Sequence, residues 1–161
     1  MPFLNAGVVF EISLGVWALA VASSDWRQRR IPNALLAPAA ALALLVLLIQ
    51  GASPLGASGM AVAKGAGLAL LLTLPGYLFR ALGAGDVKLL FVIALLGGVW
   101  ITFGSFAIGA LLTAAGGLLD LKVRSLLGLD PKQGRHLPFG SALAVGLLIM
   151  MFAGDAPPGW R

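Results

Sequence analysis

The chain has 161 residues, of which 60% are hydrophobic and 11% charged, and its net charge is +5. A soluble domain of this length cannot bury so much apolar surface, so the composition predicts an integral membrane protein. The sequence has no cysteine and only one histidine, His136, which excludes disulfides, thiolate zinc sites and paired-histidine metal motifs. We therefore expect no metal and no other cofactor.

The first predicted transmembrane span covers residues 3–24. No basic residue precedes it, so we interpret it as a retained span rather than a cleaved signal peptide. A polar segment follows, with Trp26 and three arginines, Arg27, Arg29 and Arg30. Because arginine and lysine favour the cytoplasmic side, the span is predicted to end there, and the N-terminus is predicted to lie outside.

Spans two and three follow in the next fifty residues. Span two is predicted over residues 34–49, with Asn33 as its N-cap directly after Pro32. A turn of small residues on the outer side leads to span three, predicted over residues 60–79. Arg80 closes span three on the cytoplasmic side.

Three more spans complete the predicted bundle. Spans four and five are expected at residues 87–99 and 101–119. The glycine pair at 97 and 98 and Gly104 are the only punctuation near their division, so a tilt or kink could move it by several residues. Residues 120–137 are polar and basic and are predicted to form a cytoplasmic loop. Span six is expected at residues 138–153.

The basic residues test this topology. Of the 11 lysines and arginines, only Lys64 and Arg161 fall on the predicted outer side. The positive charge is therefore interpreted as a topology signal that contacts membrane lipid, and no nucleic acid partner is expected. The prediction is one all-α domain over residues 1–161, a polytopic bundle of about six transmembrane helices.

Residues 83–88, Gly-Ala-Gly-Asp-Val-Lys, place a carboxylate between two predicted spans. Gly83 and Gly85 permit close backbone approach and φ angles that are closed to other residues. The simplest interpretation of Asp86 is a helix N-cap in front of span four.

A second aspartate favours a chemical role. Asp25 ends span one and Asp86 begins span four, so both carboxylates are predicted at the cytoplasmic face. Two adjacent carboxyl groups share a proton, so one can act as base on water and the other as acid toward a peptide bond. Helix-end electrostatics favour an ionised Asp86 and a protonated Asp25, whereas the nearby arginines oppose this at Asp25, so the assignment stays open.

The same segments carry a family resemblance. Residues 25–33 (DWRQRRIPN) and 83–88 (GAGDVK) resemble the type IV prepilin peptidases, membrane aspartic endopeptidases of the GxGD kind. Residues 137–141 (LPFGS) are similar to the Pro-Phe-Gly segment of that family, although Ser141 stands where a second proline is common. The resemblance covers most of the chain, from Asp25 to Ser141.

The resemblance implies that Asp25 and Asp86 are the catalytic pair. The implied substrate is a prepilin or pseudopilin, cut between a short basic leader and its apolar helix. The implied location is the bacterial cytoplasmic (inner) membrane, with the active site at the cytoplasmic face. Without the cysteine-containing N-terminal methyltransferase region of the long members, the chain resembles the short TadV- or CpaA-like form of Flp-type (Tad) pili. Archaeal preflagellin peptidases are a close alternative.

Ten further residues are expected to support the site or to contact the substrate. They are Gly83, Gly85, Lys88, Arg27, Arg30, Pro32, Asn33, Pro138, Phe139 and Gly140. A simpler interpretation makes the lysine an interfacial side chain and the arginines headgroup anchors.

Other interpretations are weaker. A serine protease pair of Ser58 with His136 would lie on opposite membrane faces, and Ser58 with Lys64 is better explained by a turn serine. Asp120 is expected to pair locally with Lys122 or Arg124. A non-catalytic pilus assembly subunit or a small transporter is the alternative from another class, although carriers usually hold their charges near the midplane.

Overall fold

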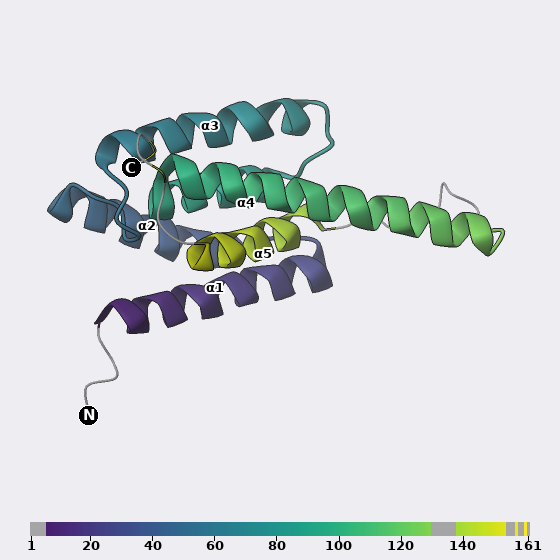
Figure 1. Ribbon diagram of the computed structural model, residues 1–161, viewed down its shortest axis with the longest axis horizontal. Coiled ribbons are helices and arrows are strands. Elements are labelled where there is room, and N and C mark those ends of the chain that lie inside the picture. Colours follow the sequence, from purple (N-terminus) through teal and green to yellow (C-terminus); the bar gives the residue numbers. More distant parts are fainter. Residues whose placement is uncertain (1–5, 130–137, 154–156, 158–159, 161) are drawn as a thin grey trace.

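The computed structural model describes residues 6–129, 138–153, 157 and 160. Within these residues there are five helices, α1 (Ala6–Gln28), α2 (Asn33–Gln50), α3 (Gly59–Leu78), α4 (Ala84–Leu126) and α5 (Phe139–Phe152) (Figure 1). Within the described residues the only β-type pairing is an isolated bridge between Ala52 and Ser58. The predicted all-α class is confirmed.

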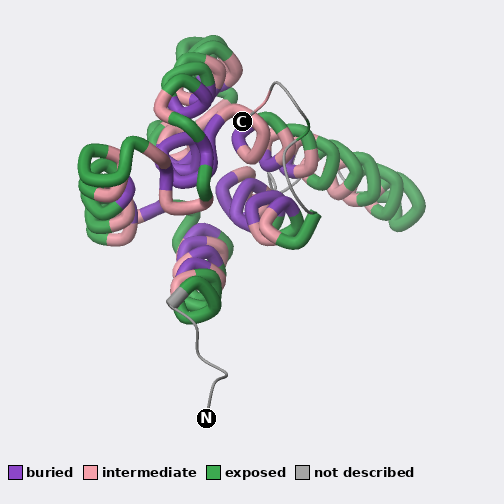
Figure 2. Tube along the Cα trace, turned by 60° about the vertical axis from the view of Figure 1, so that its left-hand side comes forward, coloured by how far each residue is buried: buried purple, intermediate pink, exposed green. Residues whose placement is uncertain are grey.

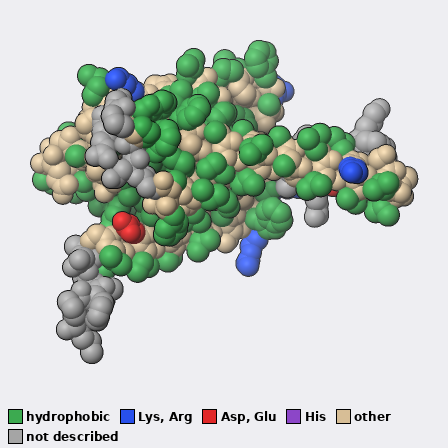
Figure 3. All heavy atoms as spheres, in the orientation of Figure 1, with side chains coloured by type: hydrophobic (Ala, Val, Ile, Leu, Met, Phe, Trp, Pro, Cys, Tyr) green, Lys and Arg blue, Asp and Glu red, His purple; other side chains and the backbone are tan. Residues whose placement is uncertain are grey.

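Four of the helices are long and apolar enough to cross a membrane. Their spans are Gly7–Gln28, Asn33–Gln50, Gly59–Leu78 and Ala84–Leu126, and α5 is a shorter apolar helix. Hydrophobic side chains are spread over the face drawn in Figure 3, and Phe79 is 84% exposed. Such exposure is unfavourable in water and suits lipid contact.

The sequence predicts six helices where the described part of the chain has five, because predicted spans four and five run together across a kink as one element, α4. Gly98 interrupts this helix with φ 71° and ψ −166° and separates a first arm, residues 84–97, from a second arm, residues 99–126. At the far end of the first arm, Leu96 O accepts a hydrogen bond from Leu55 N in the loop between α2 and α3.

Helix α5 begins beside Asp86, at the start of the first arm. Its contacts with the second arm show that the second arm runs back toward that end. The Met150 side chain, near the end of α5, occupies the space that a Cβ on Gly104 would need. Leu143, near the start of α5, contacts Gly109 further along the same arm. The reversal falls at Gly98, one of the glycines between which the sequence left the division of spans four and five open.

The first arm lies at the centre of the molecule. Leu89, Leu90 and Ile93 are completely buried, and Figure 2 shows the buried residues gathered in the middle of the bundle. A helix that is apolar on all sides needs neighbours on all sides. Glycines allow the close packing: a Cβ on Gly65 of α3 would lie 2.8 Å from the backbone of Gly98.

Two helix starts differ from the prediction. Helix α2 begins at Asn33, and Pro32 occupies the N-cap position without a side-chain hydrogen bond, so the predicted Asn33 cap is wrong. Helix α3 is capped by Ser58, whose Oγ accepts a hydrogen bond from Ala61 N at 3.3 Å. This capping role agrees with the turn interpretation of Ser58.

The predicted cytoplasmic loop over residues 120–137 is wrong in its first part, because α4 continues to Leu126. Asp120 accepts a hydrogen bond from Arg124 Nε at 2.8 Å, an i,i+4 ion pair on the projecting end of the helix (Figure 1). His136 and Leu137 lie outside the described residues.

Candidate active site

Asp25 lies in the last turn of α1 and is only 5% exposed. Its Oδ2 accepts a hydrogen bond from the backbone N–H of Ser141 at 2.6 Å and lies 3.2 Å from the hydroxyl oxygen of Ser141. A buried carboxyl group needs such partners to offset the loss of water. The start of α5 therefore holds the side chain of Asp25 in place.

Asp86 is the third residue of α4 and is partly buried. Its Oδ2 accepts a hydrogen bond from Gly83 N at 3.0 Å. The predicted N-cap role is wrong in position, because Gly83 is the N-cap and Asp86 reaches back to it. The other oxygen, Oδ1, is left to face α5.

Gly140 of α5 brings the two acids together. A Cβ added at Gly140 would lie 2.9 Å from Asp25 Oδ2 and also 2.9 Å from Asp86 Oδ1. Both oxygens therefore lie within 2.9 Å of one point, and their separation is less than twice that distance. This spacing suits two carboxyl groups that share one water molecule.

The helix-end argument for different protonation states loses its basis in this geometry. Asp25 lies at the C-terminal end of α1, yet it also meets the N-terminal end of α5. Asp86 lies at the N-terminal end of its own helix. Each carboxylate thus accepts a backbone hydrogen bond at a helix N-terminus, so its place at a helix end does not distinguish the two acids.

Neither Gly83 nor Gly85 adopts a backbone conformation that requires glycine. At Gly85 it is the missing side chain that matters, because it lets a neighbouring segment pack closely. Gly83 has φ −80° and ψ 153°, an extended conformation open to any residue. Gly85 is likewise not among the residues with positive φ. A Cβ on Gly85 would lie 3.3 Å from Ile31 Cβ, so Gly85 permits close packing on the α1–α2 connection.

Ile31 and Ser141 are site residues that the sequence analysis did not assign. Ile31 is buried, and its Cδ1 would lie 2.6 Å from a Cβ on Gly140, so it closes one side of the space around the two acids. Both residues fall inside the motifs that carry the resemblance, but hydropathy gives no sign of their contacts.

Among the described residues, no lysine or arginine forms an ion pair with either of the two acids. Lys88 is exposed and donates a hydrogen bond from Nζ to Asn33 Oδ1 at 3.0 Å, which joins the starts of α4 and α2. Arg27 and Arg30 are exposed, and the ion pair within the described residues is the one between Asp120 and Arg124. These positions fit surface anchoring better than contact with the carboxylates.

Phe139 and Pro138, two of the residues expected to support the site, have different contacts at the start of α5. The ring of Phe139 packs edge to face on Phe106 of the second arm, with ring centroids 5.9 Å apart. Pro138 is the N-cap of α5 and lines a cavity of about 500 Å³.

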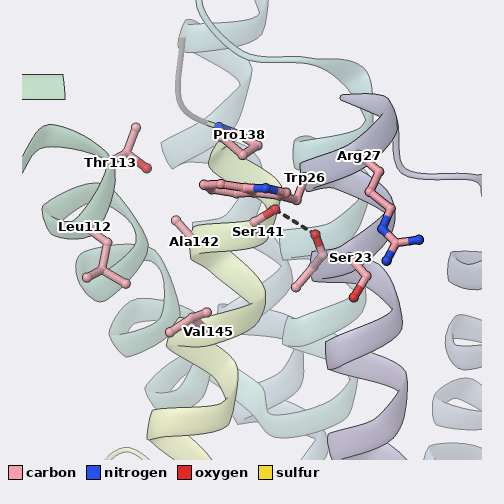
Figure 4. A pocket seen from close by; sticks show the side chains of 10 residues that line it. Ser23, Trp26, Arg27, Leu112, Thr113, Pro138, Ser141, Ala142 and Val145 are labelled. Carbon is pink, nitrogen blue, oxygen red and sulfur yellow. Dashed lines mark hydrogen bonds between the residues drawn. The ribbon is translucent and has the colours of Figure 1, made fainter. Parts of the chain in front are cut away.

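This cavity lies between α1, the second arm of α4 and α5 (Figure 4). Its lining is mostly apolar and small: Ala22, Ser23, Trp26, Arg27, Leu112, Thr113, Pro138, Ser141, Ala142 and Val145. Ser141 belongs both to this wall and to the hydrogen bonds of Asp25. A larger cavity of about 600 Å³ lies between α1 and α2 and reaches Leu96, at the end of the first arm away from Asp86.

The fold and the site define an α-helical membrane protein that pairs two carboxyl groups at helix ends. The chain belongs to the type IV leader peptidase family, which matches residues 12–118. Comparisons with curated proteins and with solved structures gave no match. Membership implies a protease with prepilins as substrates. The matched range includes Asp25 and Asp86 and ends before α5, which carries Gly140 and Ser141.

Proposed function

We propose that the chain is a membrane-embedded aspartic endopeptidase that removes the leader peptide from Flp-type (Tad) prepilins or pseudopilins. The observation that carries this proposal is the approach of Asp25 Oδ2 and Asp86 Oδ1 to one point at Gly140. Family membership supplies the reaction class, and the geometry supplies a pair of groups able to perform it.

The proposed mechanism uses the shared proton of the pair. The ionised carboxylate takes a proton from water as the water oxygen bonds to the peptide carbonyl carbon. The protonated carboxyl group donates its proton to the carbonyl oxygen, which gives a tetrahedral diol. The other carboxyl group then passes the proton taken from water to the nitrogen, the C–N bond breaks and the amine departs. A diol hydroxyl returns a proton to the carboxylate of the pair as the new carboxyl group forms. Gly83 and Ser141 hold one oxygen of each aspartate through their N–H groups, so neither side chain must reorient during the reaction.

We propose that the apolar helix of the substrate enters the cavity beside Ser141. The cavity is mostly apolar, it lies against α1 and α5, and one of its wall residues contacts Asp25. A peptide bond at the start of that helix would then lie close to the two acids. The basic leader would lie beyond the membrane boundary.

The distribution of charge supports a cytoplasmic site. Basic side chains gather at the end of the bundle that holds the two acids: Arg27, Arg29, Arg30, Arg80 and Lys88. Lys64 lies in the first turns of α3, toward the opposite end. The positive-inside rule then puts the site at the cytoplasmic face and the N-terminus outside.

The proposal is tested by co-expression with an Flp-type prepilin, reading leader removal by gel shift and N-terminal sequencing. We expect Asp25→Asn and Asp86→Asn each to abolish cleavage while remaining in the membrane. Asp120→Asn is the matched control, because Asp120 pairs with Arg124 on the projecting end of α4 and should leave cleavage intact.

Cleavage that survives in Asp25→Asn or Asp86→Asn would reject the aspartic mechanism, and cleavage that also occurs without the chain would favour a non-catalytic assembly subunit. A second substrate, a type IV prepilin from outside the Flp class, tests specificity in the same assay. Equal cleavage of both prepilins would remove the Flp-type restriction and leave the peptidase activity in place.

A further inference from the structure

Ser141 connects α5 to α1 through three polar contacts. Its backbone N–H donates to Asp25 Oδ2 at 2.6 Å, and its hydroxyl oxygen lies 3.2 Å from the same carboxylate oxygen. The hydroxyl also donates to Ala22 O at 2.9 Å, the contact drawn as a dashed line in Figure 4. Ser141 is the third residue of α5, so its N–H is one of the first-turn donors that have no acceptor within the helix.

The hydroxyl group has one proton and two acceptors in reach. It can donate to Ala22 O or to Asp25 Oδ2, but not to both at once. If Asp25 is ionised, its oxygen can accept the hydroxyl proton. If Asp25 carries a proton on Oδ2, that proton can be donated to the hydroxyl oxygen while the serine donates to Ala22 O. Both arrangements use the same heavy-atom positions.

We propose that Ser141 is a positioning residue for Asp25, whose hydroxyl adapts to either protonation state of the acid. The inference rests on the proposed function, because the orientation it preserves matters when Asp25 exchanges a proton in each catalytic cycle. Asp86 is held differently, by Gly83 at the start of its own helix. Asp25 is instead oriented by a separate helix, so its geometry depends on the packing of α5 against α1.

The kinetic test compares substitutions at Ser141 with the same change at another buried serine. Ser105 is the control, because it is fully buried and its hydroxyl has no hydrogen-bond partner in the described part of the chain. With purified enzyme and an Flp-type prepilin, we expect Ser141→Ala to lower kcat about tenfold, the size expected for one hydrogen bond to a charged group. KM should stay within about twofold, and Ser105→Ala should match the wild type.

Two further variants keep the test decisive even if Ser141→Ala fails to fold. Ser141→Thr keeps a hydroxyl and should restore most of kcat, whereas Ser141→Cys has nearly the size of serine with a weak hydrogen-bonding group and should not. Equal kcat values for the threonine and cysteine variants would overturn the proposal.

A spectroscopic test needs no substrate. Infrared spectra of protein labelled with 13C-aspartate, with the Asp25→Asn spectrum subtracted, isolate the carboxyl band of Asp25. We expect Ser141→Ala to shift this band and Ser105→Ala to leave it unchanged. If wild type cleaves no prepilin, the proposed function fails and the band still decides the role of Ser141. An unmoved band in Ser141→Ala would overturn the inference even if cleavage is confirmed.

Discussion

The two arms of α4 are both largely apolar, but the first is surrounded by other helices and the second is exposed along much of its length. The first arm is buried between the other helices and carries Asp86, whereas Leu111, Leu118 and Leu126 of the second arm are each more than two thirds exposed (Figures 1 and 2). Hydropathy alone does not separate a central helix from a helix at the edge. Their difference comes from tertiary contacts, and substitutions in the two arms should therefore have very different effects.

The largest expected difference is in catalysis. Asp86→Asn in the first arm should lower leader cleavage by about 10³-fold or more, because the pair loses a group that must exchange a proton. Asp120→Asn in the second arm removes only an i,i+4 ion pair and should stay close to wild type. Initial rates of prepilin cleavage measure both. Similar losses in the two variants would contradict the assignment of the site to the first arm.

The next effect is expected where α5 meets the first arm. Gly140→Ala would place a methyl group 2.9 Å from an oxygen of each aspartate and should lower cleavage about 100-fold, because it takes the space of the shared water. Gly67→Ala in α3 has no atom within 4 Å of the added Cβ and is the control. Gel-based cleavage assays would detect the difference. Full activity of Gly140→Ala would show that the acids react in another arrangement.

The joint between the arms should control stability. Gly98→Ala combines a positive φ of 71° with a Cβ placed 2.7 Å from Ala57 Cβ, and should destabilise by about 3 kcal/mol. Gly117→Ala lies in the second arm with nothing within 4 Å and should stabilise by about 0.5 kcal/mol. Thermal unfolding in detergent micelles compares the two, and a neutral Gly98→Ala would contradict the described reversal.

A smaller contrast is expected for leucines. Leu90→Ala in the first arm leaves a cavity at a fully buried site and should cost about 2 kcal/mol or more. Leu118→Ala in the second arm is 68% exposed and should change the free energy of unfolding by less than about 0.5 kcal/mol. The same micelle unfolding assay applies. Equal costs would mean that the second arm is covered by a partner.

Much of the fold was predictable because its signals are local. Apolar stretches bounded by arginines place the first three helices within a few residues of their ends, and the glycine pair at 97 and 98 marks the reversal in α4. The extension of α4 to Leu126 was missed because charged residues there resemble a loop by hydropathy. Asp120 and Arg124 are compatible with a helix, and their i,i+4 pair supports it.

The site was predictable only in part. Asp25 and Asp86 stand out because acids are rare in this chain, and topology places both at one end of the bundle. The contacts of Ser141 and Ile31 depend on how α5 and the α1–α2 connection pack around Gly140, which no local pattern encodes. Asn33 was assigned as a cap from its residue type, but Pro32 takes that position and Asn33 accepts a hydrogen bond from Lys88 instead.

The length of the elements that form the site has a consequence for the surrounding bilayer. The first arm of α4, residues 84–97, and helix α5 contain 14 residues each, so each is about 21 Å long. A typical hydrocarbon core is about 30 Å thick. The first arm is surrounded by other helices, but α5 keeps exposed apolar side chains such as Ile149 and Phe152, so the lipid beside α5 is expected to thin, and headgroups and water would reach closer to the two acids. A peptide bond entering from the aqueous side would then cross less hydrocarbon than a full-length span requires.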